Sequence, residues 1–185
     1  MDGDFLECLP KRTFPALENP AVQSLEATTV FAFHYAEGVV FAGDHRATAG
    51  NQIFSDKTEK IIDLDAHSMM AIAGSPAVAF EMARTLQTAF EYYRRSQLQL
   101  MSLEAKVRAL SRLIADNLPA TLQGVGAVAP IFAGLGQAES DGSDAGRPVI
   151  YFYDPMGANF EAAAFASSGS GSAHIKSILS YLENW

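Results

Sequence analysis

Three residues of this sequence have types and an order that suit nucleophilic catalysis. Thr28 opens the apolar run 28–35, Asp44 lies in a Gly-Asp turn, and Lys60 ends a polar stretch. A threonine hydroxyl is a weak nucleophile at neutral pH, but a free α-amine on the same residue can accept its proton. The order therefore suggests a chain cleaved before Thr28, so that one residue supplies both nucleophile and base.

The groups near Thr28 would set the basicity of such an amine. An α-amine in a model peptide has a pKa of about 7.7 to 8.0, close to the range in which a general base is useful. A neighbouring ammonium group lowers that pKa, and Lys60 is the candidate for this role, with Asp44 keeping it charged and oriented. Taken singly, these residues would be an ordinary strand threonine, turn aspartate and solvated lysine. The hypothesis of catalysis by Thr28 therefore depends on the spacing of the three residues taken together.

The composition fits one globular domain and argues against nucleic acid as a partner. The chain has 185 residues, 49% hydrophobic and 18% charged, which is material for one ordinary core. The formal net charge is −8 and the 13 Lys and Arg residues are scattered, whereas phosphate binding needs a clustered basic face. No apolar stretch reaches the roughly 18 to 20 residues of a membrane span. The single cysteine, Cys8, precedes Thr28 and favours a reducing, cytoplasmic setting.

The two ends of the sequence differ from its middle. Residues 1–27 contain three prolines and five acidic residues without sustained periodicity, which is typical of an extended leader. We expect a propeptide over 1–27 and the folded domain over 28–185; an ordinary disordered tail is the alternative. An amphipathic helical pattern starts at Ser172 and stops at Trp185 without a cap. We expect the C-terminal part of the domain to be missing, with a natural frayed helix as the alternative.

The order of the expected elements indicates an α+β fold. Strands are predicted over the segments 28–35, 38–42, 61–64, 68–73, 125–133, 149–153 and 159–167. Helices are predicted over 76–97, from Ser102 until Pro119 ends or kinks the helix, and from Ser172 onward. A polar loop is predicted over 137–148. Antiparallel sheets stacked between helix layers explain this order better than a parallel βαβ sheet.

Several short motifs, taken with their spacing, resemble those of a proteasome β subunit. They are Thr-Thr-Val at 28–30, Gly-Val-Val-Phe-Ala-Gly-Asp at 38–44, Arg46, Thr48, Gly50-Asn51, Lys60, Ala73-Gly74 and Gly-Ser-Gly-Ser at 169–172. The segments 73–79 and 117–124 are similar to the bacterial, actinobacterial type. The resemblance covers 28–185. It implies a four-layer αββα sandwich, two antiparallel sheets between helix layers, which is the N-terminal nucleophile hydrolase fold, here with the last layer incomplete.

The resemblance implies a threonine endopeptidase activated by autocatalytic cleavage between Ala27 and Thr28. The catalytic residues that it implies are Thr28, Asp44, Lys60 and Ser170. The backbone N–H of Gly74 would donate to the developing oxyanion, an interaction typically worth about 2.7 to 4 kcal/mol in the transition state. No cofactor and no metal is implied. The four histidines, His34, His45, His67 and His174, likewise lack metal-ligand spacing.

The resemblance also implies substrates and partners. The residues that would contact substrate are Ala47, Thr48, Ala49, Thr58, Ile62, Ile72 and Phe80. Because the pocket residues are mainly apolar, cleavage after apolar residues is expected. The implied partners are a ring of identical β subunits, proteasome α-subunit rings and a regulatory ATPase. Unfolded proteins would be degraded inside a sequestered chamber.

Some observations leave other interpretations open. Active members of the family usually carry glycine where this chain has Ala27, so self-cleavage could be slow. One alternative is therefore a non-catalytic ring subunit that keeps its leader. Another is the two-ring, heat-shock-locus protease, which lacks α subunits. Two motif matches are weak: Gly124-x-Gly126-x-x-Ala129 follows a helix where a dinucleotide fingerprint follows a strand, and 169–172 lacks the lysine of a phosphate-binding loop.

Overall fold

A computed structural model of the chain describes residues 28–49, 52–136 and 146–183. The strands are β1 (Thr29–Tyr35), β2 (Gly38–Gly43), β3 (Ala47–Ala49), β4 (Gln52–Ser55), β5 (Ile61–Asp65), β6 (Ser68–Ala71), β7 (Ile131–Leu135), β8 (Pro148–Tyr153), β9 (Asn159–Glu161) and β10 (Phe165–Gly169). The helices are α1 (Pro76–Gln97), α2 (Leu103–Asp116), α3 (Leu118–Leu122) and α4 (Ser172–Glu183).

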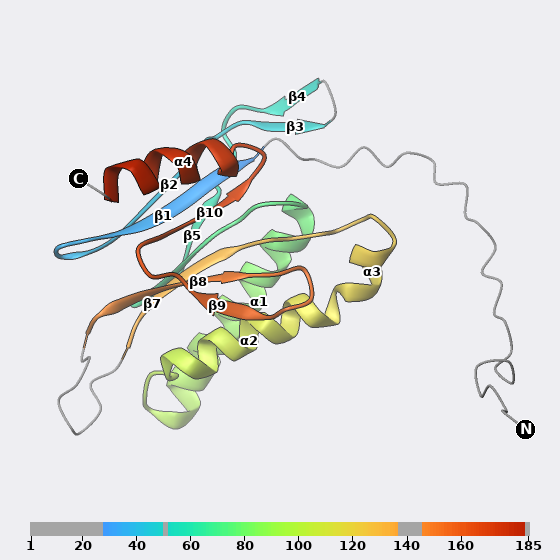
Figure 1. The fold of residues 1–185 in the computed structure, drawn as a ribbon. Helices are drawn as coiled ribbons and strands as arrows, with labels where there is room; N and C mark the ends of the chain where they lie inside the picture. The colour runs from blue at the N-terminus through green and yellow to red at the C-terminus, as the bar shows by residue number, and fades with distance from the viewer. Residues whose placement is uncertain (1–27, 50–51, 137–145, 184–185) are drawn as a thin grey trace, which may run out of the picture.

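Two antiparallel sheets form the centre of the molecule (Figure 1). One sheet has the strand order β10-β1-β2, and the other runs β5-β6-β7-β8-β9. Helices α1 and α2 cover the outer face of the five-stranded sheet, while α4 lies against β10 and β1 on the opposite side (Figure 1). The predicted α+β sandwich of four layers, αββα, is therefore confirmed.

The inner faces of the sheets pack through small and branched side chains. Along β1 the side chains of Val30 and Ala32 are fully buried, whereas those between them are partly exposed, the alternation of a strand with one covered face. Val30 and Ala32 belong to one buried cluster with Ala73 and Ile131 from the five-stranded side. This contact fixes the start of β1 relative to the segment that follows β6.

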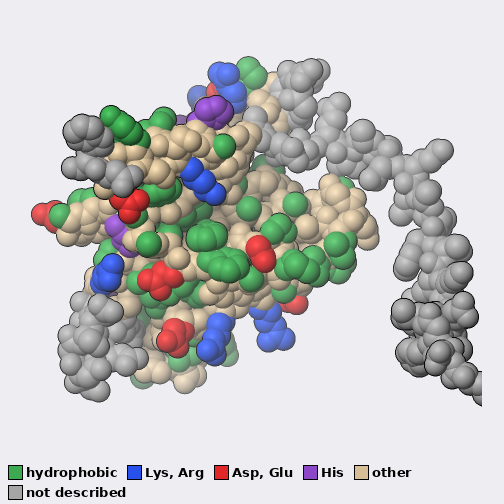
Figure 2. Space-filling view, in the orientation of Figure 1, with side chains coloured by type: hydrophobic (Ala, Val, Ile, Leu, Met, Phe, Trp, Pro, Cys, Tyr) green, Lys and Arg blue, Asp and Glu red, His purple; other side chains and the backbone are tan. Residues whose placement is uncertain are grey.

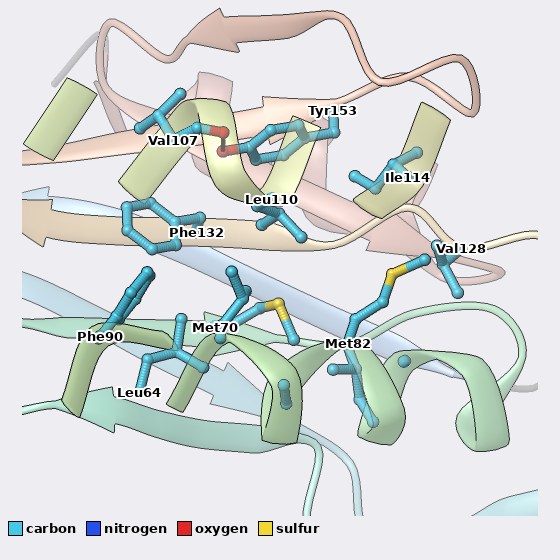
Figure 3. Close-up of a cluster of buried hydrophobic side chains, with 14 residues drawn as sticks. Leu64, Met70, Met82, Phe90, Val107, Leu110, Ile114, Val128, Phe132 and Tyr153 are labelled. Atoms are coloured by element: carbon cyan, nitrogen blue, oxygen red, sulfur yellow. Dashed lines mark hydrogen bonds between the residues drawn. The ribbon is translucent and has the colours of Figure 1, made fainter. Parts of the chain in front are cut away.

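A second core lies between the five-stranded sheet and the helices (Figure 3). On α1 the side chains of Met82, Leu86 and Phe90 recur every four residues and are buried, the spacing of a helix with one covered face. Phe132 of β7 is fully buried between the helices and the sheet. The hydroxyl of Tyr153 donates to the carbonyl of Val107 on α2 at 3.3 Å (Figure 3). Burial of this cluster anchors the segment that connects β6 to α1.

Some predicted boundaries were wrong. The segment 159–167 was predicted as one strand, but it contains β9 and the start of β10, which belong to different sheets. All three residues of β9 are exposed, so their burial pattern does not mark where the chain passes from one sheet to the other. The strand predicted over 125–133 begins only at Ile131. The β3–β4 hairpin was not predicted, and most of the predicted polar loop lies outside the described residues.

The surface of the described residues carries mixed charge. On the face shown in Figure 2, Lys and Arg side chains lie among Asp and Glu side chains rather than in one basic area. Within the described ranges, none of the helices is both long enough and apolar enough to cross a bilayer.

A buried ion pair joins α2 to the β5–β6 turn. The ammonium of Lys106, 3% exposed, lies 2.6 Å from the Asp65 carboxylate and 5.3 Å from the centre of the Phe90 ring. Burial raises the pKa of Asp65, but hydrogen bonds from Lys106, Ser68 and the His67 amide outweigh it and hold the pKa below its ordinary value. The pair therefore stabilises the fold at neutral pH, and its contribution is lost as pH falls through this depressed pKa.

Replacing Lys106 by methionine is expected to lower the free energy of unfolding by about 3 kcal/mol, because Asp65 would lose its buried cation. Urea unfolding at pH 7 measures the loss, and the exposed Arg108→Met on the same helix is the control. The difference in unfolding free energy between wild type and Lys106→Met should become smaller in acid, as Asp65 becomes protonated. If Lys106→Met and Arg108→Met have equal unfolding free energies at pH 7, a stabilising role for the Lys106–Asp65 pair is contradicted.

Candidate active site

Thr28 lies where β1 begins beside the end of β10. Its side chain is nearly buried, with 7% of the residue exposed. The Thr28 carbonyl accepts hydrogen bonds from the amide of Ser170 at 2.8 Å and from the Ser170 hydroxyl at 3.4 Å. The next residue, Thr29, pairs with Gly169 in the β1–β10 ladder. The structure thus brings together two residues, Thr28 and Ser170, that lie far apart in the sequence.

The Gly-Ser-Gly-Ser run wraps closely around the start of β1. Gly169 has φ +93°, and a Cβ at this position would overlap the Thr28 carbonyl oxygen. Both the backbone conformation and the close approach require glycine. Two residues later, the amide of Gly171 donates to the Thr29 hydroxyl at 3.1 Å. These contacts fix the main chain of Thr28 from one side.

Asp44 and Lys60 hold the other side of the same segment. Asp44 follows β2, and its carboxylate accepts the Thr29 amide at 2.8 Å. The Lys60 ammonium lies 2.9 Å from each Asp44 carboxylate oxygen and 2.5 Å from the carbonyl of Arg46. Its side chain is 3% exposed, against 40% for Asp44. The predicted aspartate–lysine partnership is therefore present, and it contacts the main chain next to Thr28.

The charge state of Asp44 follows from these contacts. Partial burial raises the pKa of its carboxyl, but the hydrogen bonds from Lys60 and the Thr29 amide, together with the Lys60 charge, outweigh it. The pKa is therefore held below its ordinary value, and Asp44 is ionised at neutral pH. Because the folded-state pKa is depressed, the contacts of the carboxylate persist above that pKa and are lost as pH falls through it.

The turn that contains Gly74 is joined to Lys60 through the main chain. The Ile72 amide donates to the Lys60 carbonyl at 2.8 Å. Beyond it, Gly74 forms an isolated antiparallel bridge with Val128 and has φ +96°. The residues on either side of Gly74 make the hydrogen bonds of this bridge: Ser75 N–H to the Ala127 carbonyl at 2.8 Å, and Ala129 N–H to the Ala73 carbonyl at 3.0 Å.

This bridge determines where the Gly74 amide points. In an antiparallel pair, a residue whose two neighbours make the ladder bonds directs its own N–H away from the partner strand. The Gly74 N–H therefore points away from 127–129, and within the described part of the chain it has no acceptor. It is available as a donor, which is what an oxyanion site needs.

The residues predicted to contact substrate fall into two groups. Ala47, Thr48 and Ala49 form β3, which pairs with β4 outside the two main sheets (Figure 1). Ile62, Ile72 and Phe80 contact the same hydrophobic cluster beneath α1. The amide of Thr58 donates to the His45 carbonyl at 2.9 Å, which places it close to the start of β3. A shared substrate pocket formed by these groups stays a prediction.

Several positions at the site were given no role by sequence reasoning. The Thr29 amide and hydroxyl, the Arg46 carbonyl and the close approach of Gly169 all shape the surroundings of Thr28. Gly169 had a signal, since it opens the Gly-Ser-Gly-Ser run. The others act mainly through main-chain atoms, which every residue type has, so their identities gave no signal.

A separate cavity of about 560 Å³ lies away from this site. It opens at the far end of the β1–β2 hairpin, beside the β5–β6 turn, and is lined by residues that include Glu37, Asp65 and His67. The length of β1 separates it from Thr28 by about 20 Å. This cavity is therefore separate from the Thr28 site.

Replacing Gly169 by alanine is expected to destabilise the protein more than the same change at a roomy glycine. Gly124 is the matched control, because it also has positive φ, +77°, but a Cβ there would meet nothing within 4 Å. Gly124→Ala should cost about 1 kcal/mol of unfolding free energy, and Gly169→Ala about 3 kcal/mol, because overlap with Thr28 is added to backbone strain. Chemical denaturation measures both. Equal losses would contradict the close approach at Gly169.

Comparison with known proteins agrees with this architecture. The model of the proteasome subunit family matches residues 25–183. The proteasome subunit beta of Acidothermus cellulolyticus is 42% identical over 155 residues, which are 84% of this chain and 52% of that relative. Proteasome subunit beta 2 of Thermomonospora curvata is 39% identical over 189 residues, covering 97% of this chain and 65% of the relative.

The matched part of each relative is shorter than the relative itself. The proteasome subunit beta of Streptomyces griseus is 36% identical over 177 residues, covering 95% of this chain and 60% of that protein. The chain thus spans between about half and two thirds of these curated relatives. The family model matches most of its length, and the three relatives described above are proteasome β subunits, so the chain belongs to the proteasome subunit family.

Proposed function

We propose that this chain is a catalytic β subunit of a proteasome, a threonine endopeptidase that degrades unfolded proteins in a sequestered chamber. The observation that carries the proposal is the arrangement at the start of β1. There the main chain at Thr28 and Thr29 is held between Ser170 on one side and the Asp44–Lys60 pair on the other. Through Asp44, the Lys60 ammonium is held next to the main chain at Thr29, and a nearby cation favours the basic form of an amine.

In the proposed mechanism, residues 1–27 are a propeptide whose removal gives Thr28 a free α-amine. The amine takes the proton of the Thr28 hydroxyl as the oxygen forms a bond to the substrate carbonyl carbon. The Gly74 N–H stabilises the resulting oxyanion. The peptide C–N bond then breaks, and the amine passes its proton to the leaving nitrogen. Water hydrolyses the remaining ester, which releases the acyl product and restores the hydroxyl.

The charges around Thr28 support this role for the amine. The Lys60 ammonium is held beside Asp44 and has almost no exposure to solvent. A buried positive charge disfavours protonation of a nearby amine, so it keeps a larger fraction of the α-amine in the basic form at neutral pH. Asp44 offsets the cost of burying the lysine and fixes its position.

The state of the N-terminus tests the proposal. We expect the full-length protein, assembled with its ring partners, to begin at Thr28 when its intact mass is measured. Thr28→Ala should retain residues 1–27 under the same conditions, because the cleavage depends on the hydroxyl. Retention of the leader by the unmodified protein would favour the alternative of a non-catalytic ring subunit, for which the specific observation is Ala27 in place of glycine.

Specificity for apolar side chains rests on the residues assigned to the pocket. Ile62, Ile72 and Phe80 contact one hydrophobic cluster, so a side chain entering beside them would meet apolar surface. Fluorogenic peptides with an apolar, a basic or an acidic residue before the cleaved bond distinguish the possibilities. The apolar peptide should give the highest kcat/KM, and the assignment fails if it is the slowest.

The proposed assembly follows from the family. We propose a homo-oligomeric β ring between α-subunit rings, fed by a regulatory ATPase in the cytoplasm. Co-purification of an α ring with the tagged full-length chain would support this arrangement. A particle made of this chain alone would instead favour the two-ring, heat-shock-locus type.

A further inference from the structure

A serine hydroxyl joins the two sheets close to Thr28. Ser168 lies on β10, where it pairs with Val30 in the β1–β10 ladder. Its hydroxyl donates to the Ala129 carbonyl at 2.7 Å. Ala129 precedes β7, which belongs to the five-stranded sheet, whereas β10 belongs to the three-stranded one. The bond therefore crosses from the sheet that carries Thr28 to the sheet that carries the Gly74 turn.

The carbonyl that Ser168 holds belongs to the support of Gly74. The amide of the same residue, Ala129, donates to the Ala73 carbonyl at 3.0 Å. Together with the Ser75 amide, which donates to the Ala127 carbonyl at 2.8 Å, this bond forms the bridge around Gly74. Fixing Ala129 from the side of β10 therefore also restrains the position of the Gly74 amide.

Gly74 needs such support because its backbone has positive φ and lies outside the regular strands. Its turn is attached to the five-stranded sheet, while the nucleophile is attached to the three-stranded sheet. The apolar side chains between the sheets, such as Val30 and Ala73, make non-directional contacts that resist a small shift only weakly. A hydrogen bond between main-chain carbonyl and hydroxyl is directional and sets the relative position of the two parts.

We propose that Ser168 is a positioning residue for the hydrolysis, acting through Ala129 to hold the Gly74 amide in line with the Thr28 hydroxyl. The inference rests on the proposed function of Thr28 and adds a residue to it. Ser168 does not touch the reacting atoms. It sets the geometry between the nucleophile and the donor that stabilises the oxyanion.

The proposal predicts a particular kinetic signature. An oxyanion exists in the transition state and not in the bound substrate, so misplacing its donor lowers kcat and leaves KM nearly unchanged. Small misplacements of a preorganised group cost up to about a hundredfold in rate. Without the Ser168 hydroxyl, the Ala129 amide would still donate to the Ala73 carbonyl, so the Gly74 turn would be only partly released. We therefore expect kcat to fall by about tenfold.

A pair of variants of similar shape isolates the hydroxyl. Ser168→Thr keeps the donor, and Ser168→Val replaces it with a methyl group on the same branched side chain. In the full-length, assembled protein, Ser168→Val should show about tenfold lower kcat than Ser168→Thr at similar KM. Ser177→Ala is the control, since the Ser177 hydroxyl also donates to a carbonyl, that of Ala173, but lies exposed on α4. Equal kcat for Ser168→Thr and Ser168→Val would overturn the proposal.

Hydrogen exchange gives a second readout that does not require activity. The amides of Ser75 and Ala129 form the bridge, so peptides covering 72–79 and 125–131 should exchange faster in Ser168→Val than in Ser168→Thr. Unchanged exchange in both segments would overturn the proposal even if the variants lose activity. Failure of the proposed function is recognised separately, because the wild type would then show no hydrolysis, or hydrolysis would persist in Thr28→Ala.

Discussion

Replacing Thr28 by alanine is expected to lower peptide hydrolysis by the assembled protein by about a thousandfold or more, because the reaction loses its nucleophile. The contacts that position this residue use its carbonyl and the neighbouring amide of Thr29 rather than the Thr28 side chain. Thr28→Ala should therefore fold and assemble like the wild type. Its loss of activity then reports the missing hydroxyl, either directly or through the retained residues 1–27.

Two further variants make this result specific. Thr28→Ser keeps a hydroxyl and an α-amine and should retain measurable hydrolysis, whereas Thr88→Ala, an exposed position on α1, should behave as wild type. Initial rates with a fluorogenic peptide, compared at equal concentrations of assembled particle, provide the measurement. Activity of Thr28→Ala within tenfold of wild type would mean that another residue is the nucleophile.

Replacing Lys60 by methionine should affect both activity and stability. The change keeps much of the side-chain volume but removes the ammonium that contacts both Asp44 oxygens and the Arg46 carbonyl. We expect hydrolysis to fall by about a hundredfold or more, because the α-amine would lose the neighbouring charge that favours its basic form. Unfolding free energy should fall by about 2 kcal/mol. That is less than for a fully buried pair, since Asp44 is 40% exposed to water.

The same variant should change the pH dependence in a defined direction. Lys60 contributes to holding the pKa of Asp44 below its ordinary value, so its removal raises that pKa. A carboxylate with a depressed pKa stabilises the fold above that pKa and stops doing so as pH falls through it. In Lys60→Met, the loss of unfolding free energy in acid should therefore begin at a higher pH. Lys57→Met changes an exposed lysine nearby and should leave the pH dependence of the unfolding free energy unchanged. If Lys60→Met and Lys57→Met show the same pH dependence, the Asp44–Lys60 pairing is contradicted.

The sequence predicted the elements whose patterns are local. The alternation in β1 and the four-residue spacing in α1 report directly which face is covered, and both elements were found where they were expected. Ser102 also caps α2 as expected, its hydroxyl accepting the Ala105 amide at 3.3 Å. Pairing of Asp44 with Lys60 was likewise predicted from their order and from the family resemblance, and the structure places them in contact.

Other features depend on contacts that no local pattern reports. The burial of Lys106 was not predicted, because it arises where α2 packs over the β5–β6 turn and places this lysine against Asp65. The crossing between β9 and β10 was missed because hydrophobic alternation does not say which sheet a strand joins. The local sequence does not distinguish Ser168 from the other serines between residues 167 and 172. The role that we propose for Ser168 depends on its hydrogen bond to Ala129, which lies 39 residues away in the sequence.

We propose that Thr28, with a free α-amine, is the nucleophile, and covalent trapping would identify the attacking residue. The full-length protein, assembled with its partners, would be treated with an electrophilic peptide bearing an apolar residue at the reactive end. Mass mapping after proteolysis would then locate the adduct. We expect one adduct, on a peptide that begins at Thr28. An adduct on another residue, or rapid hydrolysis by a particle whose chains all retain residues 1–27, would contradict it.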